Sequence, residues 1–168
     1  MKHLAPVLAL AALAATPLFA AQAPRVAVQS LAQLPQPLPL PYPEGANADR
    51  AVAAAKARAK AKHKKLLIDL GGNWCPDCRA LAGVMALPEV KRFLEAHYEV
   101  VMVDVGRFDK NGQIPAHYGI TGRLKGVPSL LIVDPRTDKL LNEGRTAALA
   151  DARSMTPQSL ADWLAQWA

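Results

Sequence analysis

The sequence predicts an α/β fold in which helices cover both faces of a central mixed β-sheet. Residues 66–70 form an apolar run of strand length, and residues 98–105 form a nearly continuous one, as in a strand that is covered on both faces. Residues 127–134 and 140–143 are joined by a short turn, which indicates a β-hairpin. Crossover helices between the first strands, then a hairpin and a closing helix, predict a three-layer sandwich.

The first 20 residues are predicted to be a secretory signal peptide, cleaved after or close to Ala20. A short basic start precedes an apolar run at 4–15, which is too short to span a bilayer, and small residues follow it. A buried N-terminal helix is the alternative. Export would place the chain in the periplasm with no stable membrane span, in an oxidising compartment where two cysteines can cycle or remain a disulfide.

Residues 21–48 are predicted to be a proline-rich linker or arm. Every second residue from 35 to 43 is proline, a pattern that excludes helix and central strand and favours extended polyproline II. The segment is either a spacer or an arm that lies on the surface of the domain. A single domain is expected to follow at 49–168.

Capping residues and apolar spacing predict the helices of this domain. Asp49 is expected to cap the first helix, Pro88 to interrupt the second, and Thr156 to cap the last. The last helix is amphipathic. Helices are expected at 50–64, 75–87, 89–96, 114–118 and 156–167.

The charge distribution argues against a nucleic-acid partner. Most of the net charge of +6 comes from one alanine-rich block at 50–65, and the signs are nearly balanced elsewhere. Only 5% of the residues are aromatic, and no stacking platform or recognition-helix pattern is present. The basic block therefore indicates a solvated helix face.

Cys75 and Cys78 are the only cysteines, and they open the predicted helix that follows the first strand. One helical turn can hold their sulfurs close enough to bond, and the N–H groups of the helix N-terminus stabilise a thiolate. A C-x-x-C beside a strand–helix pattern is typical of thiol–disulfide chemistry. Cys75 is the candidate nucleophile, with an exposed sulfur and a lowered pKa, and Cys78 would resolve the mixed disulfide.

A metal clip and an inert disulfide are the alternatives for this pair. A structural zinc site needs four ligands, and the sequence has no second C-x-x-C and no paired histidines. We therefore expect no metal and no cofactor.

Three blocks of the sequence resemble the thioredoxin superfamily. Residues 73–78, Asn-Trp-Cys-Pro-Asp-Cys, are similar to its W-C-x-x-C active site, with Trp74 and Pro76 in the family's places. Residues 116–120 and 126–131 are similar to its Y-G-I and G-V-P-T-L segments, and the match spans about residues 48–167. The resemblance implies a thioredoxin-like sandwich. It also implies that Trp74 shapes the rim of the site.

The resemblance assigns roles to three further residues. Pro128 would be cis and face the disulfide, so that the backbone of Val127 could pair with an extended substrate. Asp69, six residues before Cys75, would be a buried carboxyl that accepts the proton of Cys78. The alternative for Asp69 is a strand-end carboxylate near solvent. Thioredoxins often pair this aspartate with a lysine on the next strand, and residues 100–103 contain none.

Departures from the family pattern concern charge and loop length. Asp77 places a negative charge between the cysteines, which should oppose thiolate formation and favour the reducing direction. Residues 121–125 lengthen the segment before Pro128 and bring Arg123 and Lys125 to the rim of the site. Residues 147–155 form a second insertion without a predicted role.

We therefore expect a thiol–disulfide oxidoreductase that acts on disulfide-containing proteins, as a reductase or isomerase rather than as a strong oxidase. A membrane thiol reductant or oxidant would restore it. Two alternatives stay open. One is a binding or chaperone module whose disulfide does not cycle, and the other is a dedicated thiol reductant for cytochrome or metallocentre assembly.

Overall fold

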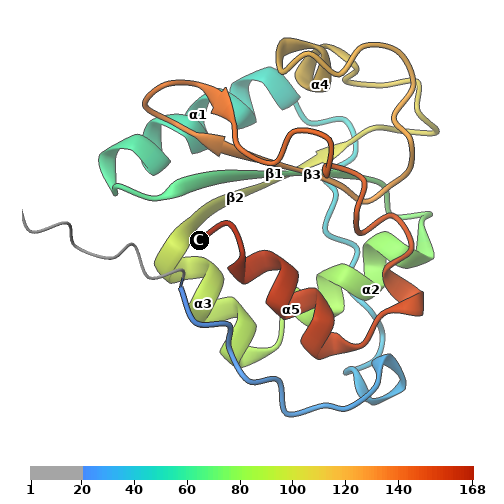
Figure 1. Cartoon of the computed structure of the whole chain (residues 1–168). Coiled ribbons are helices and arrows are strands. Elements are labelled where there is room, and N and C mark those ends of the chain that lie inside the picture. Colours follow the sequence, from blue (N-terminus) through green and yellow to red (C-terminus); the bar gives the residue numbers. More distant parts are fainter. Residues whose placement is uncertain (1–20) are drawn as a thin grey trace, which may run out of the picture.

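A computed structural model describes residues 21–168, so the predicted signal peptide lies outside the described residues (Figure 1). The elements are two 3₁₀ turns, η1 (Leu31–Gln33) and η2 (Ala152–Ser154); the helices α1 (Ala48–Ala61), α2 (Pro76–Met85), α3 (Pro88–His97), α4 (Gln113–His117) and α5 (Pro157–Ala165); and the strands β1 (Lys65–Gly71), β2 (Tyr98–Asp104), β3 (Ser129–Asp134) and β4 (Lys139–Leu140). No helix within 21–168 is both long and apolar enough to cross a membrane.

The strands form one mixed sheet in the order β2-β1-β3-β4. β1 runs parallel to β2 and antiparallel to β3, and β3 and β4 are antiparallel, as the predicted hairpin requires. β4 is shorter than predicted, because Asn142 leaves the ladder. Its buried side chain accepts from the N–H of Ile132 (2.9 Å) and donates to the carbonyl of Leu130 (2.8 Å), replacing backbone pairing there.

Helices cover both faces of the sheet, which confirms the predicted sandwich (Figure 1). α1 and α4 lie on one face, and α2, α3 and α5 lie on the other. Successive side chains of β1 divide between the two faces. Leu66, Ile68 and Leu70 pack with α1, whereas Leu67 packs with the three-helix layer.

Two helix starts test the predicted capping residues. Asn47 rather than Asp49 caps α1, and its side chain accepts the N–H of Arg50 at 2.9 Å. The prediction for Asp49 was wrong by two residues, and Asp49 lies in the first helical turn instead. Thr156 caps α5 as predicted, accepting the N–H of Ser159 at 3.1 Å.

Residues 21–47 lie against the domain as an arm. In Figure 1 the blue arm runs below α3 and α5 and past α2 before it reaches α1. Val26, Leu34 and Tyr42 are buried against the domain. Gly83 of α2 permits the close approach, because a Cβ at this position would lie 3.0 Å from the side chains of both Leu34 and Leu38.

Candidate active site

The start of α2 brings the two cysteines together. Cys75 is the N-cap residue in extended conformation, and its sulfur accepts the N–H of Cys78 at 3.2 Å. Pro76 occupies the first turn, where its missing N–H costs no hydrogen bond. The N–H of Cys75 in turn bonds to the carbonyl of Gly72, at 3.0 Å, just beyond the end of β1. Both cysteines are free thiols.

The start of α2 shifts the pKa values of the two cysteine thiols in opposite directions. The Cys78 thiol donates to the Cys75 sulfur, and with the backbone N–H groups of Cys78 and Asp77 it lowers the pKa of Cys75 to about 7. Burial and the charge of Asp77 oppose that shift. The same thiol–thiolate hydrogen bond, together with burial, raises the pKa of Cys78. When the pair ionises, the charge therefore goes to Cys75 and Cys78 keeps its proton.

The expectation of an exposed Cys75 sulfur was wrong for this dithiol form. Cys75 is only 3% exposed, and Cys78 is fully buried. The physical reason is that the Cys75 thiol turns inward, towards the loop that contains Pro128, and donates to the carbonyl of Val127 at 3.4 Å.

The Val127–Pro128 peptide bond is cis, as predicted. It leads directly into β3, so the sheet fixes the loop relative to α2. Ser129 closes the loop by donating to the carbonyl of Gly126 at 2.7 Å. The carbonyl of Val127 thus lies beside the reactive sulfur.

Trp74 lies at the rim, 37% exposed. Its indole donates to the carbonyl of Gly106 at 2.7 Å, which holds it against the loop after β2. The guanidinium of Arg107 stacks on the Trp74 ring at 4.3 Å. Phe108 also packs beside Trp74, and the guanidinium of Arg123 stacks on the Phe108 ring at 4.1 Å. The 121–125 segment therefore contributes a cation to the rim.

Asp69 is fully buried on β1. Burial raises the pKa of its carboxyl to about 7, against the hydrogen bond that Tyr42 donates to Oδ1 at 2.9 Å. Oδ2 has no hydrogen-bond partner among the described residues. The alternative for Asp69, a strand-end carboxylate near solvent, was therefore wrong. Met102 is the residue opposite on β2, which agrees with the missing lysine.

The 147–155 insertion packs on α2 and reaches the active-site motif. The backbone N–H and Nε of Arg153 both contact Oδ1 of Asp77, at 2.9 and 3.2 Å. Ala150 of the same insertion packs on Gly126, so closely that a Cβ on that glycine would lie 2.6 Å from it. The insertion therefore touches both the C-x-x-C helix and the loop before Pro128.

Sequence reasoning missed Tyr42 and Arg153. Tyr42 carried a weak signal, as the one aromatic residue of the proline-rich stretch. Arg153 carried none, because the segment around it has no periodicity. Both residues meet the active site through contacts that are distant in the sequence.

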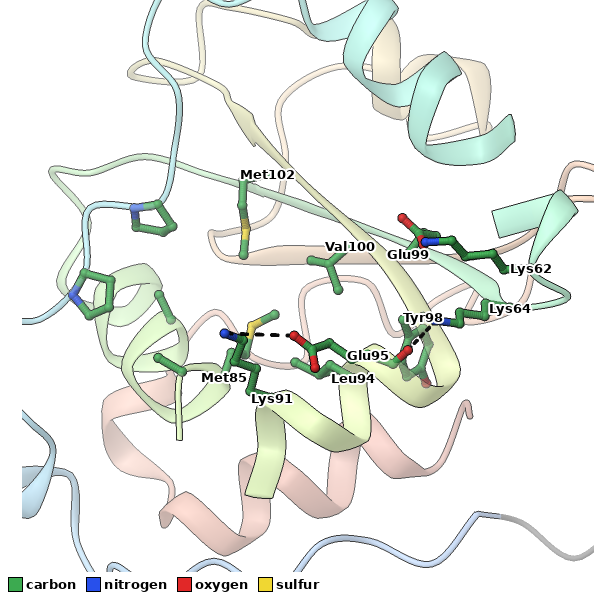
Figure 2. Close-up of a pocket in the computed structure, with 14 residues that line it drawn as sticks. Lys62, Lys64, Met85, Lys91, Leu94, Glu95, Tyr98, Glu99, Val100 and Met102 are labelled. Atoms are coloured by element: carbon green, nitrogen blue, oxygen red, sulfur yellow. Dashed lines mark hydrogen bonds and ion pairs between the residues drawn. The ribbon is translucent and has the colours of Figure 1, made fainter. Parts of the chain in front are cut away.

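A separate hollow of about 690 Å³ lies between α2, α3 and the edge strand β2 (Figure 2). Met85, Leu94 and Met102 give it an apolar wall, and the Lys91–Glu95 ion pair lies at its rim. Neither cysteine lines it, so it is not the site of thiol chemistry. Within residues 21–168 no three side chains of His, Cys, Asp or Glu gather as a metal site would require.

Comparison with known proteins places this geometry in a family. A family model described as thioredoxin-like matches residues 47–135, more than half of the chain. The chain belongs to the thioredoxin-like family. This thioredoxin-like protein is 37% identical to a disulphide isomerase of Xylella fastidiosa Temecula1, over 76% of this chain and 96% of that one, with a TM-score of 0.69.

A second solved structure, a DsbH oxidoreductase, is 24% identical over 65% of this chain and 76% of that one, with a TM-score of 0.42. No curated protein matches the sequence. With a C-x-x-C pair at the start of α2, this member of the family is a protein thiol–disulfide oxidoreductase.

Proposed function

We propose that this thioredoxin-like protein exchanges disulfides with protein substrates as a reductase or isomerase. The Cys75 thiolate attacks a substrate disulfide, one substrate thiolate leaves, and Cys78 then attacks the Cys75 sulfur and releases the other. The observation that carries the proposal is the Cys75 sulfur at the N-cap of α2, 3.2 Å from the Cys78 N–H and 3.4 Å from the carbonyl of Val127.

Ionisation would expose the nucleophile. A thiolate has no hydrogen to donate to Val127, and it is repelled by the carbonyl oxygen that the thiol contacts. A rotamer turned towards solvent is then favoured. The carbonyl that this frees can pair with an extended substrate segment, as a strand adds to the edge of a sheet.

Modest stabilisation of the Cys75 thiolate supports the reducing direction. A strongly stabilised thiolate makes the dithiol form stable and the disulfide a strong oxidant, as in DsbA, with a pKa of about 3.5, whereas thioredoxin has about 7. The pKa of Cys75 is about 7, and the charge of Asp77 works against a lower value. The isomerase name of the 37% identical structure supports the same range of activities.

Location and electron supply belong to the same proposal. The first 20 residues have the pattern of a cleaved signal peptide, which supports a periplasmic protein. An oxidising compartment would convert the dithiol to a disulfide, so a membrane thiol reductant is needed to keep Cys75 reduced, and a membrane oxidant would be needed for the opposite direction.

Insulin reduction with dithiothreitol tests the chemistry. We expect turnover by the wild type, none by Cys75→Ser, and a trapped mixed disulfide with Cys78→Ser. A protein that binds substrates without this turnover would be the binding or chaperone module. A strong preference for the thiols of one apocytochrome or metalloprotein would indicate a dedicated assembly reductant.

Equilibration with glutathione tests the direction. We expect a reduction potential nearer to the approximately −270 mV of thioredoxin than to the approximately −120 mV of DsbA. A value near the latter would contradict the proposed direction. Refolding of scrambled ribonuclease then separates an isomerase, which accelerates it, from a reductase that does not.

A further inference from the structure

Tyr42, a residue of the arm, lies inside the active site. Tyr42 is 2% exposed, although it lies in the proline-rich segment outside the sheet and its helices. Asn73, just before the active-site motif, holds its backbone on both sides: Tyr42 N–H donates to Oδ1 at 3.0 Å, and Nδ2 donates to the Tyr42 carbonyl at 2.9 Å. Arg79, just after the motif, donates to the carbonyls of Leu38 and Pro39.

The Tyr42 hydroxyl neighbours both the buried carboxyl and the resolving cysteine. It donates to Asp69 Oδ1 at 2.9 Å. The space beside Gly71 shows its second neighbour, because a Cβ built there would meet both the Tyr42 hydroxyl and the Cys78 sulfur, the latter at 2.9 Å. The two groups therefore converge on one point beside β1, and only a glycine leaves room for them.

A tyrosine hydroxyl in this position can pass a proton without gaining a net charge. It has one hydrogen, which it donates to Asp69, and oxygen lone pairs that can accept from the Cys78 thiol once Cys75 is bonded to substrate and is no longer a thiolate. Burial, and then the nearby Asp69 and Cys78, raise the pKa of Tyr42, so a free tyrosinate is disfavoured and the two transfers must be concerted. Asp69 can receive the proton, because burial raises its pKa to about 7.

We propose that Tyr42 relays the proton of Cys78 to Asp69 when the mixed disulfide is resolved, a role that rests on the proposed function. The S–H of Cys78 transfers its proton to the Tyr42 oxygen as Tyr42 transfers its own to Asp69 Oδ1. The Cys78 thiolate attacks the Cys75 sulfur, the bond from Cys75 to the substrate breaks, and the electron pair leaves with the substrate thiolate, which takes a proton from water. Cys75 and Cys78 end oxidised, and the substrate disulfide ends reduced.

The relay explains a chemical problem of this chain. Met102 lies opposite Asp69 on β2, so the strand provides no cation to assist the carboxyl. The hydrogen-bond donor to Asp69 comes from the arm instead. Residues 38–43 are therefore part of the active site rather than a spacer.

The test separates the two chemical steps in one reaction. The reduced protein is mixed with the aromatic disulfide dithiobis(nitrobenzoate). One coloured thionitrobenzoate is released when Cys75 attacks the reagent, and a second when Cys78 resolves the mixed disulfide. Tyr42→Phe keeps the buried ring and removes the hydroxyl. We expect the first phase to be unchanged and the second to slow by about 10- to 100-fold, with loss of its solvent deuterium isotope effect.

Tyr98→Phe is the matched control, because Tyr98 is equally buried and its hydroxyl donates to the carbonyl of Leu164, at 2.7 Å, in the three-helix layer. We expect both phases to be unchanged there. Asp69→Asn should slow the second phase, and adding Tyr42→Phe should slow it no further, because both residues serve one transfer.

An unchanged second phase in Tyr42→Phe, or equal slowing of both phases, would overturn the relay. Failure of the proposed function has a different signature, since the wild-type protein itself would then show no second phase and no insulin turnover. If the relay alone is wrong, the wild type is active and the second phase of Tyr42→Phe is as fast as that of the wild type.

Discussion

At the scale of residues, reactivity depends on how the two sulfurs share one proton. The hydrogen bond from Cys78 to Cys75 lowers the pKa of the first cysteine and raises that of the second. Attack therefore needs no base at neutral pH, whereas resolution does. Asp69 and Tyr42 lie on the side of Cys78, where that base is needed.

The pKa of Cys75 predicts the pH dependence of its attack. The pKa is lowered from 9.0 to about 7, so the thiolate fraction, and with it the rate of alkylation by iodoacetamide, should rise through a midpoint near pH 7. Cys78→Ala removes the largest cause of the shift, and its midpoint should lie at higher pH. Equal midpoints in the two proteins would show that backbone N–H groups alone stabilise the thiolate.

Arg153 offers a second prediction, because it partly neutralises the charge of Asp77. Arg153→Met keeps the backbone N–H bond to Asp77 and removes the guanidinium. We expect the pKa of Cys75 to rise by less than about one pKa unit, because Arg153 is exposed. The reduction potential should become more negative.

Asp77→Asn is the opposing variant, and its reduction potential should move the other way. Reduction potentials of the two variants in the same glutathione buffer check both signs. A shift of the same sign in both would contradict the electrostatic account.

At the scale of elements, the arm and the 147–155 insertion hold α2 from two sides. Leu34 and Leu38 of the arm pack over Gly83, and η2 of the insertion packs against α2, with Arg153 on Asp77. The helix that carries the cysteines is thus fixed by segments that a minimal α/β sandwich does not need. This predicts that the arm contributes to stability.

Leu34→Ala should destabilise the protein by about 2–4 kcal/mol in urea unfolding, because a buried leucine side chain leaves a cavity over α2. Leu40→Ala is the matched control in the same arm. Leu40 is 63% exposed, so its truncation should change stability by less than about 0.5 kcal/mol. Similar small effects of both substitutions would mean that the arm is held by its polar contacts alone.

At the scale of the whole molecule, one buried carboxyl should tie folding stability to pH. Folding raises the pKa of Asp69 from 3.8 to about 7, so between these values the folded protein holds a proton that the unfolded chain has lost. Stability contributed by this proton is complete below about pH 4 and is lost as pH rises to about 7.

Asp69→Asn should remove this dependence. Relative to the wild type, the variant should gain up to about 4 kcal/mol of stability between about pH 4 and about pH 8, in urea unfolding of the reduced proteins. Parallel pH profiles of the two proteins would show that Asp69 titrates alike in the folded and unfolded states.

The sequence by itself determined the architecture and the chemistry. Apolar runs, turn residues and capping positions predict the mixed sheet and its helices, because these signals are local and repeat with a fixed period. The C-x-x-C pair and Gly126-Val127-Pro128 predict the redox centre and its cis bond, because both depend on short, contiguous segments. β4 ended early because Asn142 bonds across the sheet, which its own segment does not reveal.

Only the tertiary structure decided what surrounds the two sulfurs. It turned the Cys75 thiol inward to Val127, placed Arg153 on Asp77, and brought Tyr42 from the arm to Asp69 and Cys78. Each of these contacts joins residues separated by 27 positions or more, Tyr42–Asp69 being the shortest separation. Such contacts depend on how whole elements pack, and no local pattern of residue types encodes them.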